Sequence, residues 1–147
     1  MEHVDLTHPY FGRLRYDEGL DGWETAAPAS EPPVEIFFAP DACEDEEALL
    51  SEAEAVCRDL LSWRERALDR VVMDLLPLKN GPWRDRAAGE AELTAQQMRD
   101  QVELGSITFY GKGEMELLHD DGDLFSGHAI LVSASIDEGP TEASLAG

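Results

Sequence analysis

The sequence predicts an α+β fold, in which helices pack on one face of a mostly antiparallel sheet of about six strands. Residues 10–38 and 106–135 contain short runs that alternate apolar and polar residues, as strands do. Residues 41–76 lack glycine and proline and repeat apolar residues every three or four positions, as helices do. The expected order is three strands, two or three helices and three strands, and a chain of 147 residues is expected to form one domain over 1–147.

The first three strands are expected before Pro40. Tyr10, Leu14 and Tyr16 share one face of the first candidate strand, while the arginines between them occupy the other. Turn residues follow, and a short second strand is expected from Trp23 to Ala27. The third is expected over 34–38, with Val34, Ile36 and Phe38 on its buried face.

The middle of the chain is expected to be helical. Apolar residues recur at positions 49, 53, 56, 60, 63, 67, 71 and 75, and Asp41 with Glu44 resembles a helix-start box. A second such box at Ser62 favours two helices with a break there over one long helix. Pro77 and then Asn80-Gly81-Pro82 are expected to stop the helical region, and a loop is expected to follow through Gly89. A third box at Thr94 opens a short helix to about Val102.

The last three strands are expected after residue 105. Residues 106–110 and 114–118 have the alternation of two paired strands, which predicts a hairpin around Gly111-Lys112-Gly113. A polar corner leads into the last strand, His128 to Ser135, with Ile130 and Val132 inward. The acidic tail from about residue 137 is expected to pack only through Leu145.

The charge balance excludes several classes of protein. The 32 acidic and 11 basic side chains give a net charge of −21, which disfavours nucleic acids and anionic membranes as partners. No stretch approaches the roughly 20 apolar residues of a membrane-spanning helix, and no secretory signal is visible, so a cytoplasmic protein is expected. Cys43 and Cys57 are expected to be small apolar residues without a disulfide.

The acidic residues are unevenly distributed. Thirteen lie between Tyr16 and Cys57 and eight more lie from Gly113 onward, with no basic residue in either stretch. One interpretation is a solvated, soluble surface with no strong partner, as in a housekeeping domain. The other is a field that attracts a basic protein such as a nuclease.

The densest group of metal-ligand residue types is the corner His119, Asp120, Asp121, Asp123 and His128. Its spacing does not match a calcium loop, and the aspartates are more typical of a tight turn in which Gly122 takes a positive φ. Both readings stay open: a turn, or a divalent-metal enzyme that uses His119, Asp120, Asp123 and His128. Since the chain lacks a nucleophile elbow and a nucleotide-binding loop, the sequence favours a binding protein over an enzyme and predicts no cofactor.

Several segments resemble one known family. They are Phe11-Gly12-Arg13-Leu14 with Tyr16-Asp17 and Trp23-Glu24, Leu78-Lys79-Asn80 with Trp83, and Asp121-Gly122-Asp123-Leu124-Phe125 with Gly127-His128. Together they resemble the bacterial family called Domain of Unknown Function 2262 over nearly the whole chain. The resemblance implies a small bacterial cytoplasmic α+β domain with no assigned activity, and no catalytic residues to carry over.

The sequence therefore favours a protein-interaction module with a basic protein partner, of which toxin neutralisation, as by an immunity protein, is the most concrete version. Carboxylates of the 41–54 segment and of the corner would bind the partner's arginines and lysines, with Phe125 or Phe37 as an apolar anchor. The candidate binding residues are Glu44, Asp45, Glu46, Glu47, Asp120, Asp121, Asp123, Phe125 and His128. The oligomeric state is left open.

Overall fold

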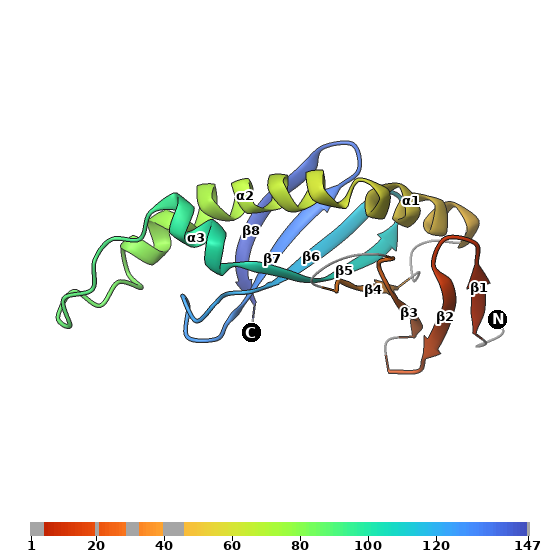
Figure 1. The fold of residues 1–147 in the computed structure, drawn as a ribbon, viewed down its shortest axis with the longest axis horizontal. Coiled ribbons are helices and arrows are strands. Elements are labelled where there is room, and N and C mark those ends of the chain that lie inside the picture. Colours follow the sequence, from red (N-terminus) through yellow and green to blue (C-terminus); the bar gives the residue numbers. More distant parts are fainter. Residues whose placement is uncertain (1–4, 20, 29–32, 40–45, 147) are drawn as a thin grey trace.

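One sheet and three helices make up the part of the chain that the computed structural model describes, residues 5–19, 21–28, 33–39 and 46–146. Four described strands precede the helices and four follow them (Figure 1). The strands are β1 (Leu6–His8), β2 (Gly12–Asp17), β3 (Gly22–Ala26), β4 (Glu35–Phe38), β5 (Glu103–Gly111), β6 (Glu114–Asp120), β7 (Ala129–Ser135) and β8 (Gly139–Ala146). The helices are α1 (Glu46–Arg58), α2 (Leu60–Asn80) and α3 (Ala95–Gln101). The α+β class is thus confirmed.

The strands lie in the sheet in the order in which they occur in the chain. Neighbours are antiparallel except β4 and β5, which run parallel with Ile36 opposite Ile107. Parallel neighbours need a long crossover connection, and the three helices lie within it. This crossover places α1 and α2 along one side of the sheet, and the other side is left without a helix (Figure 1).

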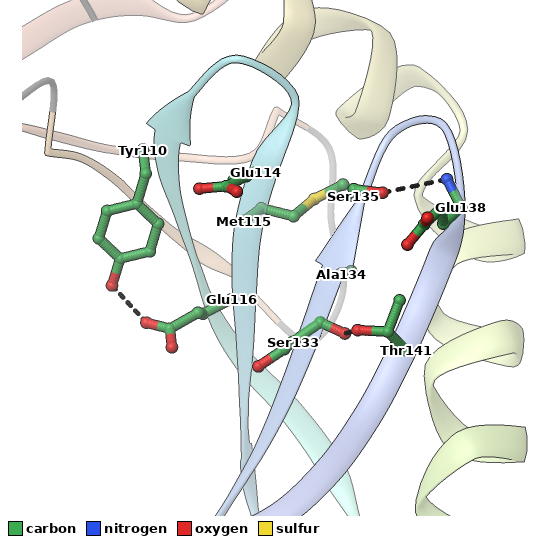
Figure 2. A pocket seen from close by; sticks show the side chains of 9 residues that line it. All are labelled: Tyr110, Glu114, Met115, Glu116, Ser133, Ala134, Ser135, Glu138 and Thr141. Atoms are coloured by element: carbon green, nitrogen blue, oxygen red, sulfur yellow. Dashed lines mark hydrogen bonds between the residues drawn. The ribbon is translucent and has the colours of Figure 1, made fainter. Parts of the chain in front are cut away.

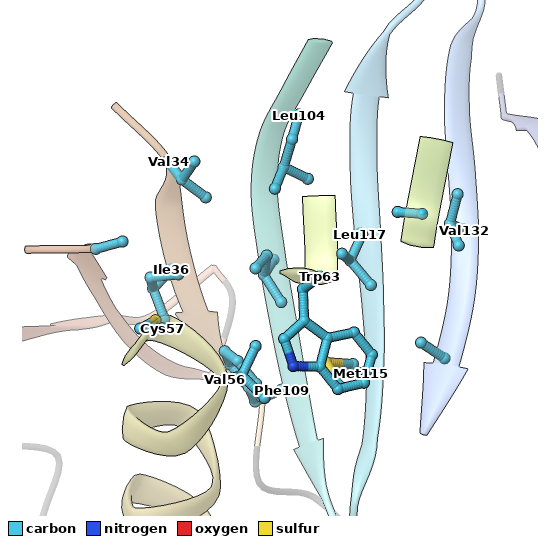
Figure 3. Packing of buried hydrophobic residues seen from close by; sticks show 14 of the residues in the cluster. Val34, Ile36, Val56, Cys57, Trp63, Leu104, Phe109, Met115, Leu117 and Val132 are labelled. Atoms are coloured by element: carbon cyan, nitrogen blue, oxygen red, sulfur yellow. The ribbon is translucent and has the colours of Figure 1, made fainter. Parts of the chain in front are cut away.

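The core lies between this sheet and its helices. Val34, Ile36 and Phe38 are completely buried, as their alternation predicts. On the helical side, Trp63 of α2 lies over β6, the strand that carries Met115 and Leu117 (Figure 3). Burial of one face per strand leaves every second side chain of β6 and β7 on the uncovered face.

The start of α3 is confirmed in detail. The Thr94 hydroxyl accepts the Gln97 backbone N–H, and the Gln97 side chain accepts the Thr94 N–H in return. The expected cap at Asp41 lies outside the described residues. None of the described helices is long and apolar enough to cross a membrane.

The boundaries of the long helical region differ from the prediction. Two helices form, but the break lies at Asp59 and not near Ser62. Ser62 lies inside α2, because the Trp63 N–H already donates to the Asp59 carbonyl. The helical hydrogen bonds therefore begin before the capping box predicted at Ser62. The helix also continues past Pro77 to Asn80, because a proline in the last turn removes only one intrahelical hydrogen bond.

The prediction of about six strands was wrong by two. β1 has only three residues, which is too short for a periodic signal. The tail after residue 137, expected to pack only through Leu145, forms β8 and pairs with β7 from Ala129 opposite Ala146 to Ser135 opposite Gly139. Its sequence gives a weak strand signal because β8 lies at an edge and Ala143 is the only apolar side chain buried within it.

Candidate functional site

The polar corner between β6 and β7 is organised by Asp121. Its side chain is buried, and its carboxylate accepts three backbone N–H groups, from Asp123 at 2.9 Å, Phe125 at 2.9 Å and Gly127 at 3.0 Å. Both carboxylate oxygens are therefore occupied by the loop's own backbone. Asp121 is not available to a partner, which corrects its assignment as a binding residue.

The other two corner aspartates, Asp120 and Asp123, have exposed side chains. Asp120 accepts the N–H of Gly122 at 2.8 Å, and Asp123 has a left-handed backbone with φ of 65°. Gly122 takes the expected positive φ of 59°, and a Cβ there would lie 2.5 Å from the Gln101 carbonyl oxygen. The corner thus has the geometry of a tight, backbone-bonded turn.

The two histidines of this segment lie in different environments. His119 is 2% exposed on the helix-covered face of β6, whereas His128 is half-buried with its Nδ1 2.7 Å from the Phe125 carbonyl oxygen. Across the described ranges of the chain, no three His, Cys, Asp or Glu side chains are grouped so that they could hold a metal ion. The four residues proposed as metal ligands are thus not brought together.

The buried His119 ring is neutral near pH 7. Loss of solvation lowers its pKa to about 4, although the carbonyls of Ile130 and Leu117 act in the opposite direction. Its Nδ1 lies 3.2 Å from the Leu117 carbonyl oxygen, an acceptor, so Nδ1 carries the proton. Its Nε2 has no hydrogen-bond partner among the described residues.

Two of the segments that resemble the family meet at this corner. The Trp83 ring packs edge-on against the rings of Phe125 and His128, with centroids 5.5 Å apart in both pairs. The loop that carries Trp83 is fastened by buried Lys79, whose ammonium donates to the Trp83 carbonyl at 3.1 Å and to Glu90 at 2.7 Å. The resemblance therefore marks a packed junction, and Phe125 is fully buried in it, so its side chain is not exposed as the apolar anchor that the sequence suggested.

The acidic segment before and within α1 is only partly described. Glu44 and Asp45 lie outside the described residues. Glu46 and Glu47 are exposed in the first turn of α1, where negative charge stabilises a helix N-terminus. Cys57 at the other end of α1 is buried, and burial raises the pKa of its thiol to about 12, so it is an unreactive thiol.

Sequence reasoning missed a hollow on the uncovered face of the sheet, at the β6–β8 edge (Figure 2). It has a volume of about 340 Å³ and contains three carboxylates, from Glu114, Glu116 and Glu138. Its remaining lining comprises Tyr110, Met115, Ser133, Ala134, Ser135 and Thr141, so no basic side chain is among the described residues that line it. The alternation of Glu114 and Glu116 with buried Met115 and Leu117 was the available signal.

Glu116 is hydrogen-bonded within this hollow. It accepts a hydrogen bond from the Tyr110 hydroxyl on the neighbouring strand (Figure 2). Partial burial and this bond raise the pKa of Tyr110 to about 12, so the hydroxyl stays protonated as a donor. Thr141 is also ordered, because its hydroxyl donates to the Ser133 carbonyl at 3.1 Å. The hollow therefore presents oxygen acceptors, of which the Glu116 carboxylate is held by a hydrogen bond.

A second hollow of about 350 Å³ lies at the other end of the same face and differs in charge. Its lining includes Arg13 and Arg15 as well as Glu24 and Glu35. Arg15 is paired with Glu24 at 2.8 Å, so much of the local charge is balanced. The uncovered face is thus mixed in charge at β2–β4 and acidic at β6–β8.

Residues 8–145 match a family model described as "Uncharacterized protein conserved in bacteria (DUF2262)". No curated protein and no solved structure matches the chain. The match covers nearly the whole chain, in agreement with the resemblance of the separate motifs.

Proposed function

The chain belongs to the DUF2262 family of uncharacterised bacterial proteins, and we propose that it is a non-catalytic interaction module that binds a basic surface of another protein. The observation that carries this proposal is the acidic hollow at the β6–β8 edge. Three carboxylates and several hydroxyl groups line about 340 Å³ there, and no basic side chain is among them. A protruding arginine or lysine of a partner fits such a hollow in charge and in hydrogen bonding.

The wider charge distribution supports the same surface. No lysine or arginine occurs from Gly113 to the end of the chain, so β6, β7 and β8 contribute only negative formal charges. A one-signed surface of this kind attracts a basic protein at long range and increases its association rate, most strongly at low salt. Toxin neutralisation is the most concrete form of this proposal, since a nuclease toxin must have a basic cleft to hold nucleic acid.

The proposed surface differs from the one that the sequence suggested. Asp121 and Phe125 are buried within the corner and leave Asp120, Asp123 and the start of α1 as the remaining exposed candidates. Those groups are scattered on a turn and on one helix turn. Glu114, Glu116 and Glu138, by contrast, line one hollow on paired strands and their connecting turn.

The test is capture from the native host's lysate at low and moderate salt, with three variants of the protein as bait. One carries Glu114→Gln, Glu116→Gln and Glu138→Gln; the second carries Glu46→Gln and Glu47→Gln; the third carries Asp120→Asn and Asp123→Asn. We expect the unaltered protein to retain a basic protein more weakly as salt rises, and only the first variant to lose it.

The outcomes distinguish an error in the proposed binding surface from an error in the proposed function. Loss of the partner in the second or third variant alone would move the binding surface to α1 or to the corner. If no basic protein is retained at either salt, the interaction proposal itself is wrong. Matching thermal unfolding of the three variants controls for loss of the fold.

A further inference from the structure

A third hollow lies on the helix-covered side, where α2 and α3 meet β5 and β6, and it is separate from the acidic hollow. It has a volume of about 190 Å³. Its lining combines buried Val102, Leu104 and His119 with the more exposed side chains of Arg64, Leu68, Asp100 and Glu103. The buried members must form its inner end and the exposed members its mouth.

His119 makes the inner end chemically distinctive. The side chain is 98% buried and its Nε2 has no hydrogen-bond partner among the described residues, whereas buried polar atoms are almost always paired. Because Nδ1 donates to the Leu117 carbonyl, Nε2 is left with a lone pair and needs a donor. The missing partner is therefore a hydroxyl or N–H group.

The other residues that line the hollow determine the size and polarity of the ligand. Leu68, Val102 and Leu104 offer apolar contact around the unpaired acceptor. A cavity of about 150 Å³ holds a single benzene ring, so one ring or a short aliphatic chain fits against this apolar part in volume. The guanidinium of Arg64 and the carboxylates of Asp100 and Glu103 complete the lining, and its net negative formal charge disfavours an anionic ligand.

We propose that this hollow binds a small uncharged molecule that combines a one-ring or short-chain apolar body with a single hydrogen-bond donor, and that His119 Nε2 accepts that donor. The apolar body lies against Leu68, Val102 and Leu104. This site is independent of the proposed protein partner, since the two hollows are on opposite sides of the sheet.

Phenol and toluene are the matched probes, because they have nearly the same shape and only phenol has a donor. The full chain, labelled with ¹⁵N, is titrated with each probe at pH 7 while the ring nitrogens of the histidines and the backbone amides are followed by NMR. We expect phenol to move the His119 Nε2 resonance saturably, together with the amides of Val102 and Leu104. Toluene is expected to leave the Nε2 resonance in place.

A variant adds a second readout. In His119→Phe, which keeps a ring but removes the acceptor, phenol is expected to bind about five- to tenfold more weakly, the loss of one hydrogen bond. The proposal is overturned if phenol and toluene shift His119 equally, or if neither moves the amides of Val102 and Leu104. The comparison of the two probes needs no variant, so it decides the question even where His119→Phe does not fold.

Discussion

The carboxylate of Asp74 on α2 accepts the backbone N–H of Ala143 on β8 at 2.9 Å, across 69 positions of the chain. β8 is an edge strand, and an edge strand exposes backbone donors that no neighbouring strand can pair. Arg70 holds Asp74 in place through two hydrogen bonds, of 2.9 and 2.8 Å. These bonds keep the pKa of Asp74 below its ordinary value. The Asp74 side chain on α2 thus holds β8, the strand at the acidic edge of the sheet, against the helices.

Replacing Asp74 is expected to loosen this edge. Asp74→Ala leaves both the Ala143 N–H and the Arg70 guanidinium without their acceptor, which should lower the free energy of unfolding by about 1–3 kcal/mol. Urea unfolding measures this loss in the free energy of unfolding. Asp69→Ala is the matched control on the same helix, because Asp69 is 70% exposed in its pair with Arg99 and should cost less than about 1 kcal/mol. Equal losses in the two variants would show that the bond to β8 adds nothing.

The buried His119 ring is expected to make the stability of the protein depend on pH. The folded protein keeps this ring neutral down to a pKa of about 4, while the unfolded chain binds its proton near the ordinary value of 6.5. The unfolded state therefore holds more protons between these values, so stability is full above about pH 6.5 and falls as the pH decreases towards 4. The total effect is on the order of 3 kcal/mol.

The variant His119→Leu isolates that effect. Because leucine does not titrate, the variant should lose less stability than the unaltered protein between pH 7 and pH 5, a range that lies above the ordinary titration of carboxylates. The difference between the two urea-unfolding curves, followed with pH, is the measurement. Parallel curves for the two proteins would mean that His119 titrates alike in the folded and unfolded states.

Much of the fold was predictable because it depends on local periodicity. The alternation in residues 34–38 and 129–135 and the capping box at Thr94 are each complete within a short segment. β8 was not predictable in this way, since it is stabilised by β7 and by Asp74, which lie far from it in the sequence. The position of the helix break was also missed: the capping pattern at Ser62 predicts a start there, but the Trp63 N–H already donates to the Asp59 carbonyl.

The candidate site was less predictable than the fold. The sequence singled out the corner aspartates by residue type, but it cannot tell that Asp121 is surrounded by three amide donors of its own loop. The acidic hollow requires Glu116 and Glu138 to meet through strand pairing and a turn, which only the three-dimensional structure shows. Residue type thus predicted the sign of the surface charge and not the place where it is concentrated.

Asp121 is expected to matter for stability more than for binding. Asp121→Asn has nearly the same size, but its amide group turns an N–H₂ towards backbone donors that need an acceptor. We expect a loss of about 2–3 kcal/mol in the free energy of unfolding. Asp120→Asn, at an exposed position with one backbone bond, should change it by less than about 0.5 kcal/mol. Thermal or urea unfolding compares them, and a neutral Asp121→Asn would refute the anchoring role.

Gly22 tests the packing of β3 against β4. A Cβ at this position would lie 1.7 Å from the carbonyl oxygen of Phe38, a backbone atom that cannot move aside without breaking the pairing of the two strands. We expect Gly22→Ala to cost about 3 kcal/mol or more, at the upper end of overpacking effects. Gly12→Ala is the control: its φ is +75° but nothing lies within 4 Å, so only the backbone cost of roughly 1–2 kcal/mol applies. Urea unfolding of both variants separates steric overlap from backbone conformation, and a Gly22→Ala protein as stable as Gly12→Ala would mean that β3 and β4 can separate locally without loss of the core around Phe38.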